Sequence, residues 1–432
     1  MKSLLRNFIR FSYAILTYAL FPVLIFFWIL KGIFNNVYLD RMTQRFGFNY
    51  PDLRGGSVWI HAVSVGEVQA TIPLVNQIKS RYPDKDIIIT TVTPTGALQV
   101  KNIFHDTVHH SYIPFETPFT VKNFFNSIKP CIALIMETEI WPNLYNECGL
   151  RKIPLILVSA RISLKSLANY KRFLPLFRET LSHGILIAAQ SKIDAERFIS
   201  LGADPNRTWV MGNIKFDFTL PKGTVKQGEI IKENSFNNRP IWIAASTHEG
   251  EEDIILDAHK EILKNINNMV LILAPRHPER FQKIKQKLSS DKWEYKSRSD
   301  FEKTHRKCEV FLIDTIGELL LFYAASDIAF VGGSLLPIGG HNLLEPASLG
   351  LPTISGPYTF NQKEMTNLLE EADALKIISD SRELANNIIT FHSNRSESEV
   401  VGERAKAIVE NNKGAISGLM RRLDDIFPEK QI

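Results

Sequence analysis

The stretch that decides the fold is VWIHAVSVGE, residues 58–67, in which an apolar run turns into a loop that carries Glu67. A helical pattern follows from Val68 to Ser80, and the next strand-like run covers residues 86–91. This alternation of strand and helix predicts a parallel sheet that is covered by helices on both faces. Such folds bind ligands at the carboxyl ends of their strands, so Glu67 belongs to a candidate site.

A second loop, METEIWP at residues 136–142, repeats this arrangement after the apolar run 132–135. A glutamate at such a strand end can act as a general base when it reaches a hydroxyl proton. The structural alternative is that Glu67 only supplies the negative charge that the first turn of a helix favours. Two glutamate loops in one half of the chain favour a ligand site over that alternative.

The alternation of strand and helix occurs twice along the chain. Residues 205–240 interrupt it with polar sequence containing Pro and Gly, which is typical of an interdomain linker. We therefore predict two doubly wound α/β domains, with one long amphipathic helix from about Glu403 to Leu423 at the end. The predicted strands are 58–60, 86–91, 132–135, 155–158 and 185–189 in the first half, and 241–244, 270–274, 310–313, 328–331 and 353–354 in the second.

The amino terminus contains an uncharged, mostly apolar run at residues 11–30. About 20 apolar residues suffice to cross a bilayer as a helix. Basic residues flank the run on both sides, and no small-residue cleavage site is evident, so we predict a retained membrane anchor. Pro22, Ser12 and Thr17 leave a shallow, monotopic insertion open beside a full crossing.

Composition excludes several other classes of protein. Lys and Arg number 51 against 46 Asp and Glu, and the resulting net charge of +5 does not argue for nucleic acid. It does suit a protein that works beside an anionic membrane surface. Cys131, Cys148 and Cys308 have no CxxC spacing, so we expect neither a zinc site nor a disulfide framework. Reduced thiols in the cytosol are the default for such a chain.

The second half carries signals for an anionic ligand in four loops that follow predicted strands. Arg276 offers a planar fork for a phosphate or a carboxylate. The glycine pairs Gly332-Gly333 and Gly339-Gly340 let backbone approach a ligand, and a helix that starts near Asn342 would point its amino terminus at an anion. Glu345 could accept hydrogen bonds from ribose hydroxyls. The loops are 246–249, 275–278, 314–318 and 332–345.

Each of these loops also has a structural interpretation. Ser246-x-x-Glu249 and Thr315-x-x-Glu318 have the pattern of helix capping boxes, and Arg276 alone could be a surface ion pair. Four such loops on one sheet edge favour a ligand site. Neither a P-loop nor a strand-led GxGxxG is present, which disfavours the usual nucleoside triphosphate and dinucleotide sites.

Seven motifs together resemble one known family, the Kdo transferases, which transfer 3-deoxy-D-manno-octulosonic acid (Kdo) to lipid A precursors. The resemblance runs in order over essentially the whole chain and includes the amino-terminal anchor. Within residues 316–318 and 342–345 it departs from the family only at apolar positions. The motifs are SVGE (64–67), TPTG (93–96), METEIWPNL (136–144), GNIKFD (212–217), STHEGE (246–251), APRHPER (274–280) and GGHN (339–342).

The resemblance implies a GT-B glycosyltransferase with two Rossmann-like doubly wound domains that face a cleft. The implied donor is CMP-Kdo and the acceptor is the lipid A precursor lipid IVA, in lipopolysaccharide core biosynthesis. The catalytic domains would lie on the cytoplasmic side of the inner membrane. The implied segments are a membrane anchor at 1–34, an acceptor domain at 35–212, a linker at 213–238, a donor domain at 239–402 and a helix crossing back at 403–432.

The resemblance also implies roles for individual residues. Glu67 would be the general base of an inverting transfer, and Glu137 and Lys215 would stabilise the transition state. No metal or cofactor would be needed, because Arg276 and the helix near Asn342 would neutralise the single phosphate of CMP. The implied donor contacts are Pro275, Arg276, Ile316, Gly317, Glu318, Asn342, Leu343, Leu344 and Glu345.

Three other readings remain open from the sequence. The first is a GT-B transferase that uses a different nucleotide sugar, such as a UDP-sugar. The second is a membrane-tethered binding protein on an inactive scaffold, and the third is a hydrolase or epimerase of the same fold. A metal site at His61, His109 and His110 is disfavoured, because acidic partners at ligand spacing are missing.

Overall fold

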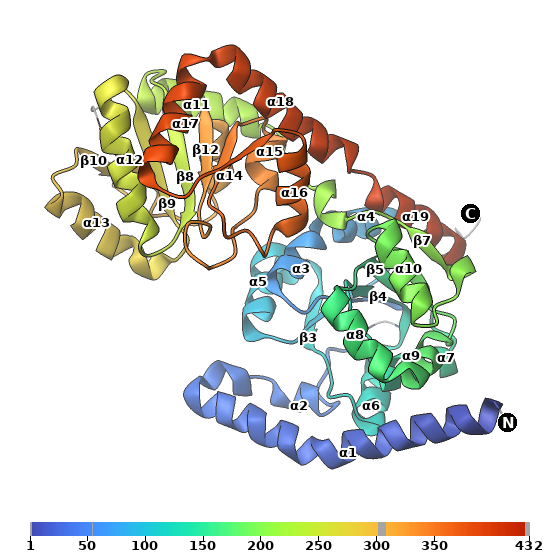
Figure 1. Ribbon diagram of the computed structural model, residues 1–432. Coiled ribbons are helices and arrows are strands. Elements are labelled where there is room, and N and C mark those ends of the chain that lie inside the picture. Colours follow the sequence, from blue (N-terminus) through green and yellow to red (C-terminus); the bar gives the residue numbers. More distant parts are fainter. Residues whose placement is uncertain (1, 54, 301–307, 428–432) are drawn as a thin grey trace. The chain divides into compact units, whose positions relative to one another are not determined.

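The computed structural model describes residues 2–53, 55–300 and 308–427, which form two compact units (Figure 1). Unit 1 contains Met1–Phe218 together with Asn412–Ile432, and unit 2 contains Thr219–Asn411. Each unit is built on a seven-stranded sheet. All pairings within both sheets are parallel, so the predicted α/β architecture is confirmed.

The sheet of unit 1 has the strand order β3-β2-β1-β4-β5-β6-β7. The order runs outward in both directions from the neighbouring strands β1 and β4, so the topological switch point lies between them. The strands are β1 (Ser57–His61), β2 (Ile87–Thr91), β3 (His109–Tyr112), β4 (Pro130–Met136), β5 (Leu155–Ala160), β6 (Leu186–Ala189) and β7 (Thr208–Val210).

Helices cover both faces of this sheet because its central strands are apolar on both sides. In β1, Val58 and Ile60 pack into one core and Trp59 into the other. The first face is covered by α3 (Val65–Ala70), α4 (Ile72–Arg81), α5 (Pro94–Phe104) and α19 (Ala415–Ile426). The second is covered by α6 (Pro118–Ile128), α7 (Pro142–Leu150), α9 (Leu174–Leu181) and α10 (Lys192–Ser200), with α8 (Leu164–Arg172) beside α9.

The sheet of unit 2 has the order β10-β11-β9-β8-β12-β13-β14, with its switch point between β8 and β12. Its strands are β8 (Ile241–Thr247), β9 (Val270–Pro275), β10 (Tyr295–Ser297), β11 (Val310–Leu312), β12 (Ile328–Val331), β13 (Thr353–Ser355) and β14 (Leu375–Ile377). Its helices are α11 (Thr224–Phe236), α12 (Glu251–Asn265), α13 (Phe281–Ser290), α14 (Leu319–Ala324), α15 (Leu344–Ser348), α16 (Lys363–Glu371), α17 (Ser381–Ser393) and α18 (Arg395–Asn411).

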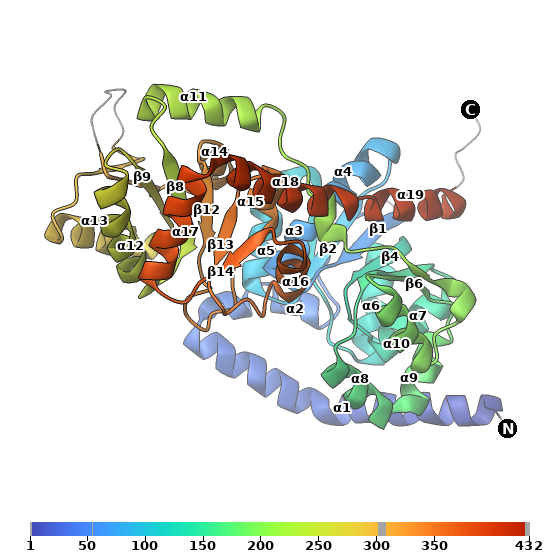
Figure 2. The ribbon, with the colours of Figure 1, turned by 45° about the horizontal axis from the view of Figure 1, so that its top comes forward.

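Three predictions about elements need correction. The helix expected at 68–80 is two helices, α3 and α4, with Pro73 in the first turn of the second. The segment expected as a linker, 213–238, contains the boundary between the two units and includes the short 3-10 helix η4 (Ile214–Asp217) and the helix α11, which packs beside α14 (Figure 2). Every predicted strand is present, but β3, β7, β10 and β14 were not predicted.

The single helix expected from Glu403 to Leu423 is also wrong, because α18 ends at Asn411 and α19 begins at Ala415. Gly414 has a φ of 106°, a left-handed conformation that glycine adopts without steric cost. The Asp217 carboxylate accepts hydrogen bonds from the N–H groups of Gly414 at 2.6 Å and Ile416 at 2.5 Å, so it holds the start of α19 on unit 1. Residues 428–432 of the predicted terminal segment lie outside the described residues.

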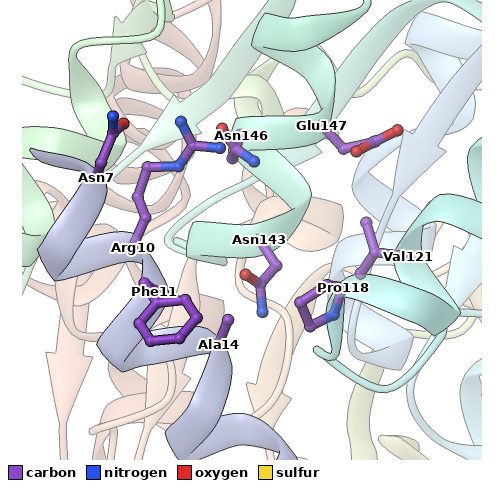
Figure 3. A pocket seen from close by; sticks show the side chains of 9 residues that line it. All are labelled: Asn7, Arg10, Phe11, Ala14, Pro118, Val121, Asn143, Asn146 and Glu147. Atoms are coloured by element: carbon purple, nitrogen blue, oxygen red, sulfur yellow. The ribbon is translucent and has the colours of Figure 1, made fainter.

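The apolar amino terminus forms α1 (Lys2–Phe34), of which Arg6–Phe34 is long and apolar enough to cross a membrane. The helix packs against α7 and α9 of unit 1. A cavity of about 300 Å³ lies between α1, α6 and α7, and Figure 3 shows Arg10 and Phe11 of α1 among the residues that line it.

Candidate functional site

In unit 1, the two predicted glutamate loops flank the switch point of the sheet. The loop after β1 leads into α3 and carries Glu67, and the loop after β4 begins with Glu137. Strands β1 and β4 are neighbours with His61 opposite Ile135, so both loops leave the same edge side by side. Both predicted glutamate loops thus lie at the carboxyl ends of parallel strands, beside the switch point of the sheet.

Glu67 lies in the first turn of α3 and is half-buried. Its Oε2 accepts a hydrogen bond from the N–H of Val63 at 2.9 Å, and its Oε1 accepts one from the Ser64 hydroxyl at 2.9 Å. Ser64 caps the same helix by accepting from the N–H of Glu67. The first-turn position considered from sequence is thus real, and the hydrogen bonds from Val63 and Ser64 fix the direction in which the carboxylate points. Burial raises the pKa of Glu67, and the neighbouring charge of Glu137 adds to that effect.

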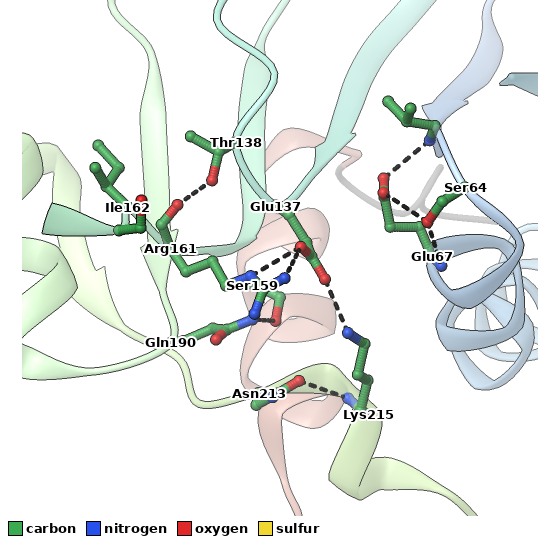
Figure 4. A network of polar contacts seen from close by, with 12 residues as sticks. Ser64, Glu67, Glu137, Thr138, Ser159, Arg161, Ile162, Gln190, Asn213 and Lys215 are labelled. Atoms are coloured by element: carbon green, nitrogen blue, oxygen red, sulfur yellow. Dashed lines mark hydrogen bonds and ion pairs between the residues drawn. The ribbon is translucent and has the colours of Figure 1, made fainter. Parts of the chain in front are cut away.

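Glu137 forms the centre of an ion-pair network that Figure 4 shows. The Lys215 ammonium lies 2.9 Å from Oε1 of Glu137, and the Arg161 guanidinium lies 2.8 Å from Oε2. Burial by itself raises the pKa of Glu137, but the two cations outweigh it and hold the pKa below its usual range. Glu137 has a φ of 53°, a strained conformation for a residue with a side chain.

Lys215 reaches Glu137 from the 3-10 helix η4, and two polar residues fix that helix. The Ser159 hydroxyl accepts from the N–H of Ile214 at 3.2 Å and from the Gln190 side chain at 3.1 Å. The Asn213 side chain caps η4 by accepting from the N–H of Lys215 at 3.0 Å. These hydrogen bonds hold the backbone of η4, and from that fixed position the Lys215 side chain extends to Glu137.

A third carboxyl group, Glu139, lies in the same loop as Glu137. Its Oε2 accepts from the Trp141 indole N–H at 2.9 Å. Burial raises the pKa of Glu139 to about 7, and the charge of Glu67 contributes to the rise. This site thus holds one carboxylate kept ionised by cations and two with raised pKa values. Such a spread of pKa values is typical of groups that exchange protons during catalysis.

In unit 2, all four predicted loops leave one edge, because β11, β9, β8 and β12 are adjacent and parallel. The loops after β8 and β12 flank the switch point and are joined through one buried carboxylate. Glu251 accepts hydrogen bonds from the N–H groups of His248, Gly333, Ser334 and Leu335 at 2.8–2.9 Å. Glu251 is 0% exposed, so the two loops are held together by a fully buried side chain.

Arg276 directly follows Pro275, the last residue of β9, and its side chain is exposed at this edge. Its backbone N–H donates to the carbonyl of Thr247 at 3.0 Å, which fixes the loop against β8. Three histidines gather nearby: Nε2 of His248 lies 2.7 Å from Nε2 of His341, and the His277 ring centroid is 5.1 Å from that of His248. Burial, with Arg276 next to it, lowers the pKa of His341 to about 4.

The three predicted residues in the loop after β11 lie in different environments. Ile316 is 79% exposed, and Gly317 has a φ of 91° that allows the tight turn. The Glu318 carboxylate accepts from the Arg298 guanidinium, with the shortest contact at 2.7 Å, and this hydrogen bonding lowers its pKa. Glu318 is therefore already paired within the protein, while its loop leaves exposed backbone around Gly317.

Residues 342–345 comprise two polar residues that bond to each other and two leucines that are buried in the core. Asn342 accepts from the N–H of Leu344 at 3.1 Å and donates to Oε1 of Glu345 at 3.0 Å. Burial raises the pKa of Glu345. The side chains of Leu343 and Leu344 are 1% and 8% exposed, so these two residues belong to the core and offer a ligand only their backbone.

Two capping boxes weighed from sequence do not form as written. Ser246 has a φ of 56°, and α12 begins at Glu251 rather than after Ser246. The Thr315 hydroxyl does bond to Glu318, but α14 begins beyond Glu318. Both motifs are therefore loop structures at the sheet edge.

Three residues of these sites were not predicted from the sequence. Glu139 and Glu251 lie within the predicted motifs but received no role, and Arg161 lies outside them. A signal existed for Glu139, which lies two residues from Glu137 in the same loop. The role of Glu251 depends on N–H groups more than 80 residues away, and no local pattern reveals that contact. Within the described residues, no group of three or more His, Cys, Asp or Glu is arranged to hold a metal ion.

Comparison with known proteins gives a consistent result. Residues 40–218 match the family model described as 3-deoxy-D-manno-octulosonic-acid transferase (kdotransferase). A 3-deoxy-D-manno-octulosonic acid transferase from Haemophilus influenzae is 38% identical over 416 residues, covering 95% of this chain and 97% of the relative. The protein of the same name from Aquifex aeolicus is 34% identical over 80% of this chain and 88% of its own length.

Among solved structures, a UDP-N-acetylglucosamine 2-epimerase aligns with a TM-score of 0.56. The alignment covers 88% of this chain and 98% of that one at 16% identity. At this identity the likeness concerns the fold alone. It confirms the predicted pair of Rossmann-like doubly wound domains.

Proposed function

This chain belongs to the family of 3-deoxy-D-manno-octulosonic acid transferases, and from that premise we propose the details of its reaction. It is a glycosyltransferase that moves Kdo. The donor is CMP-Kdo, the acceptor is the lipid A precursor lipid IVA, and the transfer inverts the anomeric carbon. The observation that carries the proposal is the pairing at one switch point of Glu67, with its raised pKa, and Glu137, which two cations keep ionised.

Glu67 is the general base. The acceptor hydroxyl oxygen attacks the anomeric carbon of Kdo, the bond from that carbon to the CMP phosphate breaks, and the hydroxyl proton passes to Glu67. The hydrogen bonds from Val63 and Ser64 hold the carboxylate in one orientation, and a raised pKa makes it a better proton acceptor. The charge that leaves with CMP is negative, so a cationic environment for the phosphate is required.

Glu137 and Lys215 act on charge rather than on protons. Positive charge develops on the sugar in transfers of this type. An ionised Glu137 near the reacting carbon stabilises that charge, and Arg161 and Lys215 keep the carboxylate ionised. The side chain of Lys215 is 35% exposed, so its ammonium can also meet an anionic group of the donor.

Unit 2 holds the CMP part of the donor. Arg276 and the exposed backbone around Gly317 provide a cation and N–H donors at one sheet edge. His248 and His341 share a short contact and stay neutral, so they present one N–H and one lone pair between them. Asn342 and Glu345 are donor contacts that the family resemblance implies, and Glu345 would accept hydrogen bonds from ribose hydroxyls. The reaction is proposed to need no metal.

The helix α1 lies in the plane of the membrane, and the catalytic units are on the cytoplasmic side of the inner membrane. The support is that α1 contacts unit 1 along its length instead of leaving it. Arg10 Nε lies 3.7 Å from Glu179, Tyr18 accepts from the N–H of Phe119 at 3.2 Å, and the Trp28 ring centroid is 6.4 Å from that of Phe115. The exposed face is apolar and includes Phe8, Phe11, Leu20, Val23, Phe26, Phe27 and Ile33.

The test is transfer by the purified full-length chain in detergent–lipid micelles that contain lipid IVA. CMP-Kdo and a UDP-sugar are offered separately, and products are resolved by mass and by the anomeric configuration of the new linkage. We expect a Kdo adduct of inverted configuration from CMP-Kdo alone. Transfer from the UDP-sugar, or retention of configuration, would contradict the proposal.

A further inference from the structure

One cavity of unit 1 is lined by none of the residues to which the reaction proposed above gives a role. It has a volume of about 770 Å³ and lies between the segment after α1, the helix α5 and the edge strand β3. Its walls include apolar side chains of α5, among them Ala97, Leu98 and Val100, together with Tyr38 and Arg41 from the segment after α1. The motif TPTG at 93–96, which the proposed reaction does not use, forms one end of it through Pro94 and Thr95.

A buried cation lies behind this cavity. Arg45 is 2% exposed, and its guanidinium lies 3.8 Å from the ring of Trp28 and 4.3 Å from that of Tyr112. One nitrogen donates to the carbonyl of Val92 at 2.6 Å, while Nε is buried without a partner. Among the described residues no carboxylate forms an ion pair with Arg45. A buried charge without a counter-ion is costly, so such a group is seldom kept for packing alone.

A second cation joins Arg45 at the cavity wall. The Arg41 guanidinium lies 4.8 Å from the centroid of the same Tyr112 ring, and its Nη1 is 3.0 Å from Nδ1 of His110. Oδ2 of Asp40 lies 3.3 Å from Nε of Arg41, and the Asp40 side chain is 59% exposed. Burial and the two arginines lower the pKa of His110 to about 3, so the histidine is neutral and accepts from Arg41. Arg41 is 36% exposed and is therefore able to meet a ligand.

Arg41 and Arg45 lie near the same edge of the sheet as the glutamate loops. Arg45 binds the carbonyl of Val92, directly after β2, and β2 pairs with β1 so that Thr90 is opposite His61. Strands in a sheet are about 4.8 Å apart, so the end of β3 lies about 10 Å from the end of β1, which leads to Glu67. A ligand of sugar size held at Arg41 would thus extend toward the glutamate loops. The apolar face of α1 begins at the same end of unit 1, since Trp28 packs on Arg45.

We propose that this cavity binds the anionic headgroup of a membrane lipid, with Arg41 contacting a phosphate and Arg45 supplying the uncompensated charge behind it. The apolar α5 wall receives the carbon skeleton next to that phosphate. The lipid is a phosphorylated glycolipid, which under the proposed function is the acceptor; only this identification rests on that function. A planar guanidinium is suited to two-point contact with phosphate oxygens.

The test measures binding of the full-length chain to phosphatidylcholine nanodiscs, without any Kdo transfer. The nanodiscs contain no additive, phosphatidylglycerol, a bisphosphorylated glucosamine lipid, or that lipid after dephosphorylation. Leu98 is 58% exposed on the cavity wall, so Leu98→Glu and Leu98→Lys place opposite charges there with little risk to folding. Controls are Leu150→Glu, at a position 65% exposed on α7, and Arg207→Gln, half exposed and outside the cavity.

We expect the phosphorylated glycolipid alone to strengthen binding. Arg41→Gln should weaken that gain by about tenfold, as loss of one hydrogen bond to a charged group does. Leu98→Glu should weaken it by about tenfold through repulsion between the new carboxylate and the phosphate, whereas Leu98→Lys and both controls should not weaken it. Equal binding by Arg41→Gln and wild type, or an equal gain from phosphatidylglycerol, would overturn the assignment. If wild type transfers no Kdo but follows the expected binding pattern, the proposed reaction fails and the lipid site stands.

In the transfer assay the same variants separate lipid binding from chemistry. Leu98→Glu should raise KM for the lipid acceptor by about tenfold while kcat and KM for CMP-Kdo stay within about twofold of wild type. A fall in kcat with an unchanged acceptor KM would contradict a headgroup site and assign the effect to the catalytic loop.

Discussion

At the scale of single residues, the carboxyl groups of Glu67 and Glu139 are electrostatically linked. Burial and, after it, the charge of the ionised Glu67 together raise the pKa of Glu139 to about 7. Removing the charge of Glu67 should therefore lower the pKa of Glu139. The sign is unambiguous, because a nearby negative charge always disfavours a second ionised carboxylate.

The Trp141 indole offers a direct measurement of this link, since its N–H donates to Glu139 at 2.9 Å. We expect the indole ¹H–¹⁵N signal of Trp141 to titrate near pH 7 in wild type and at a lower pH in Glu67→Gln. Trp141→Phe assigns the signal. An unchanged or higher midpoint in Glu67→Gln would show that the two carboxyl groups are not coupled as described.

The positive charge of Lys215 also affects these carboxyl groups, and its effect on a carboxyl pKa is opposite to that of a neighbouring carboxylate. Its charge lowers the pKa of Glu67, so Lys215→Met should raise that pKa further above the ordinary glutamate value. A base must be deprotonated, so activity is lost as pH falls through its pKa. The acid limb of the kcat/KM profile should therefore move to higher pH in Lys215→Met, in addition to any loss of rate. The exposed Lys222→Met is the matched control, and a shift to lower pH would contradict the account.

At the scale of elements, the loops after β8 and β12 depend on one carboxylate. Glu251 accepts four backbone N–H groups at 0% exposure, so Glu251→Ala would leave several buried donors unpaired. Each unpaired donor costs about 1–3 kcal/mol, and we expect the free energy of unfolding to fall by about 3 kcal/mol or more. Chemical denaturation measures it. The neighbouring Glu249→Ala should leave the denaturation midpoint unchanged, and equal midpoints for both variants would refute the role of Glu251.

Which strands could be predicted from sequence follows from their place in the sheets. The central strands, such as β1 and β8, are buried on both faces and read as continuous apolar runs. The missed strands β3, β7, β10 and β14 are the outer strands of the two sheets, and each has partly exposed positions. An edge strand with one open side is short and polar, so it leaves little periodic signal.

At the scale of the whole molecule, the parts of the site that could be predicted from sequence are those that directly follow a buried strand. Glu67 and Glu137 each follow a buried strand, so the parallel-sheet rule alone brings their loops to one edge. The partner of Glu137 is different, because Lys215 lies 78 positions away in a short 3-10 helix. Only the family resemblance pointed to Lys215, and only the folded chain reveals its contact with Glu137.

The position of α1 along unit 1 gives a prediction for the membrane-bound molecule. With Cys131, Cys148 and Cys308 replaced by alanine, single cysteines at Asn7 and Asn36 mark the two ends of the helix. An in-plane helix keeps both ends on the side of the catalytic units, so both should react with an impermeant maleimide in inside-out inner-membrane vesicles. Ser80→Cys on α4 is the positive control. Reaction at Asn7 only after detergent is added would show that α1 crosses the bilayer.

The measurement that tests the central claim most directly is the rate of Kdo transfer by Glu67→Gln. The variant keeps the shape of the side chain and its hydrogen bond to Ser64 but cannot accept the hydroxyl proton. With unchanged melting temperature and unchanged CMP binding, we predict a fall in kcat of about 10²–10⁴-fold, the usual contribution of a general base. A folded Glu67→Gln protein that transfers Kdo within about threefold of the wild-type rate would contradict the account and move the base to another group.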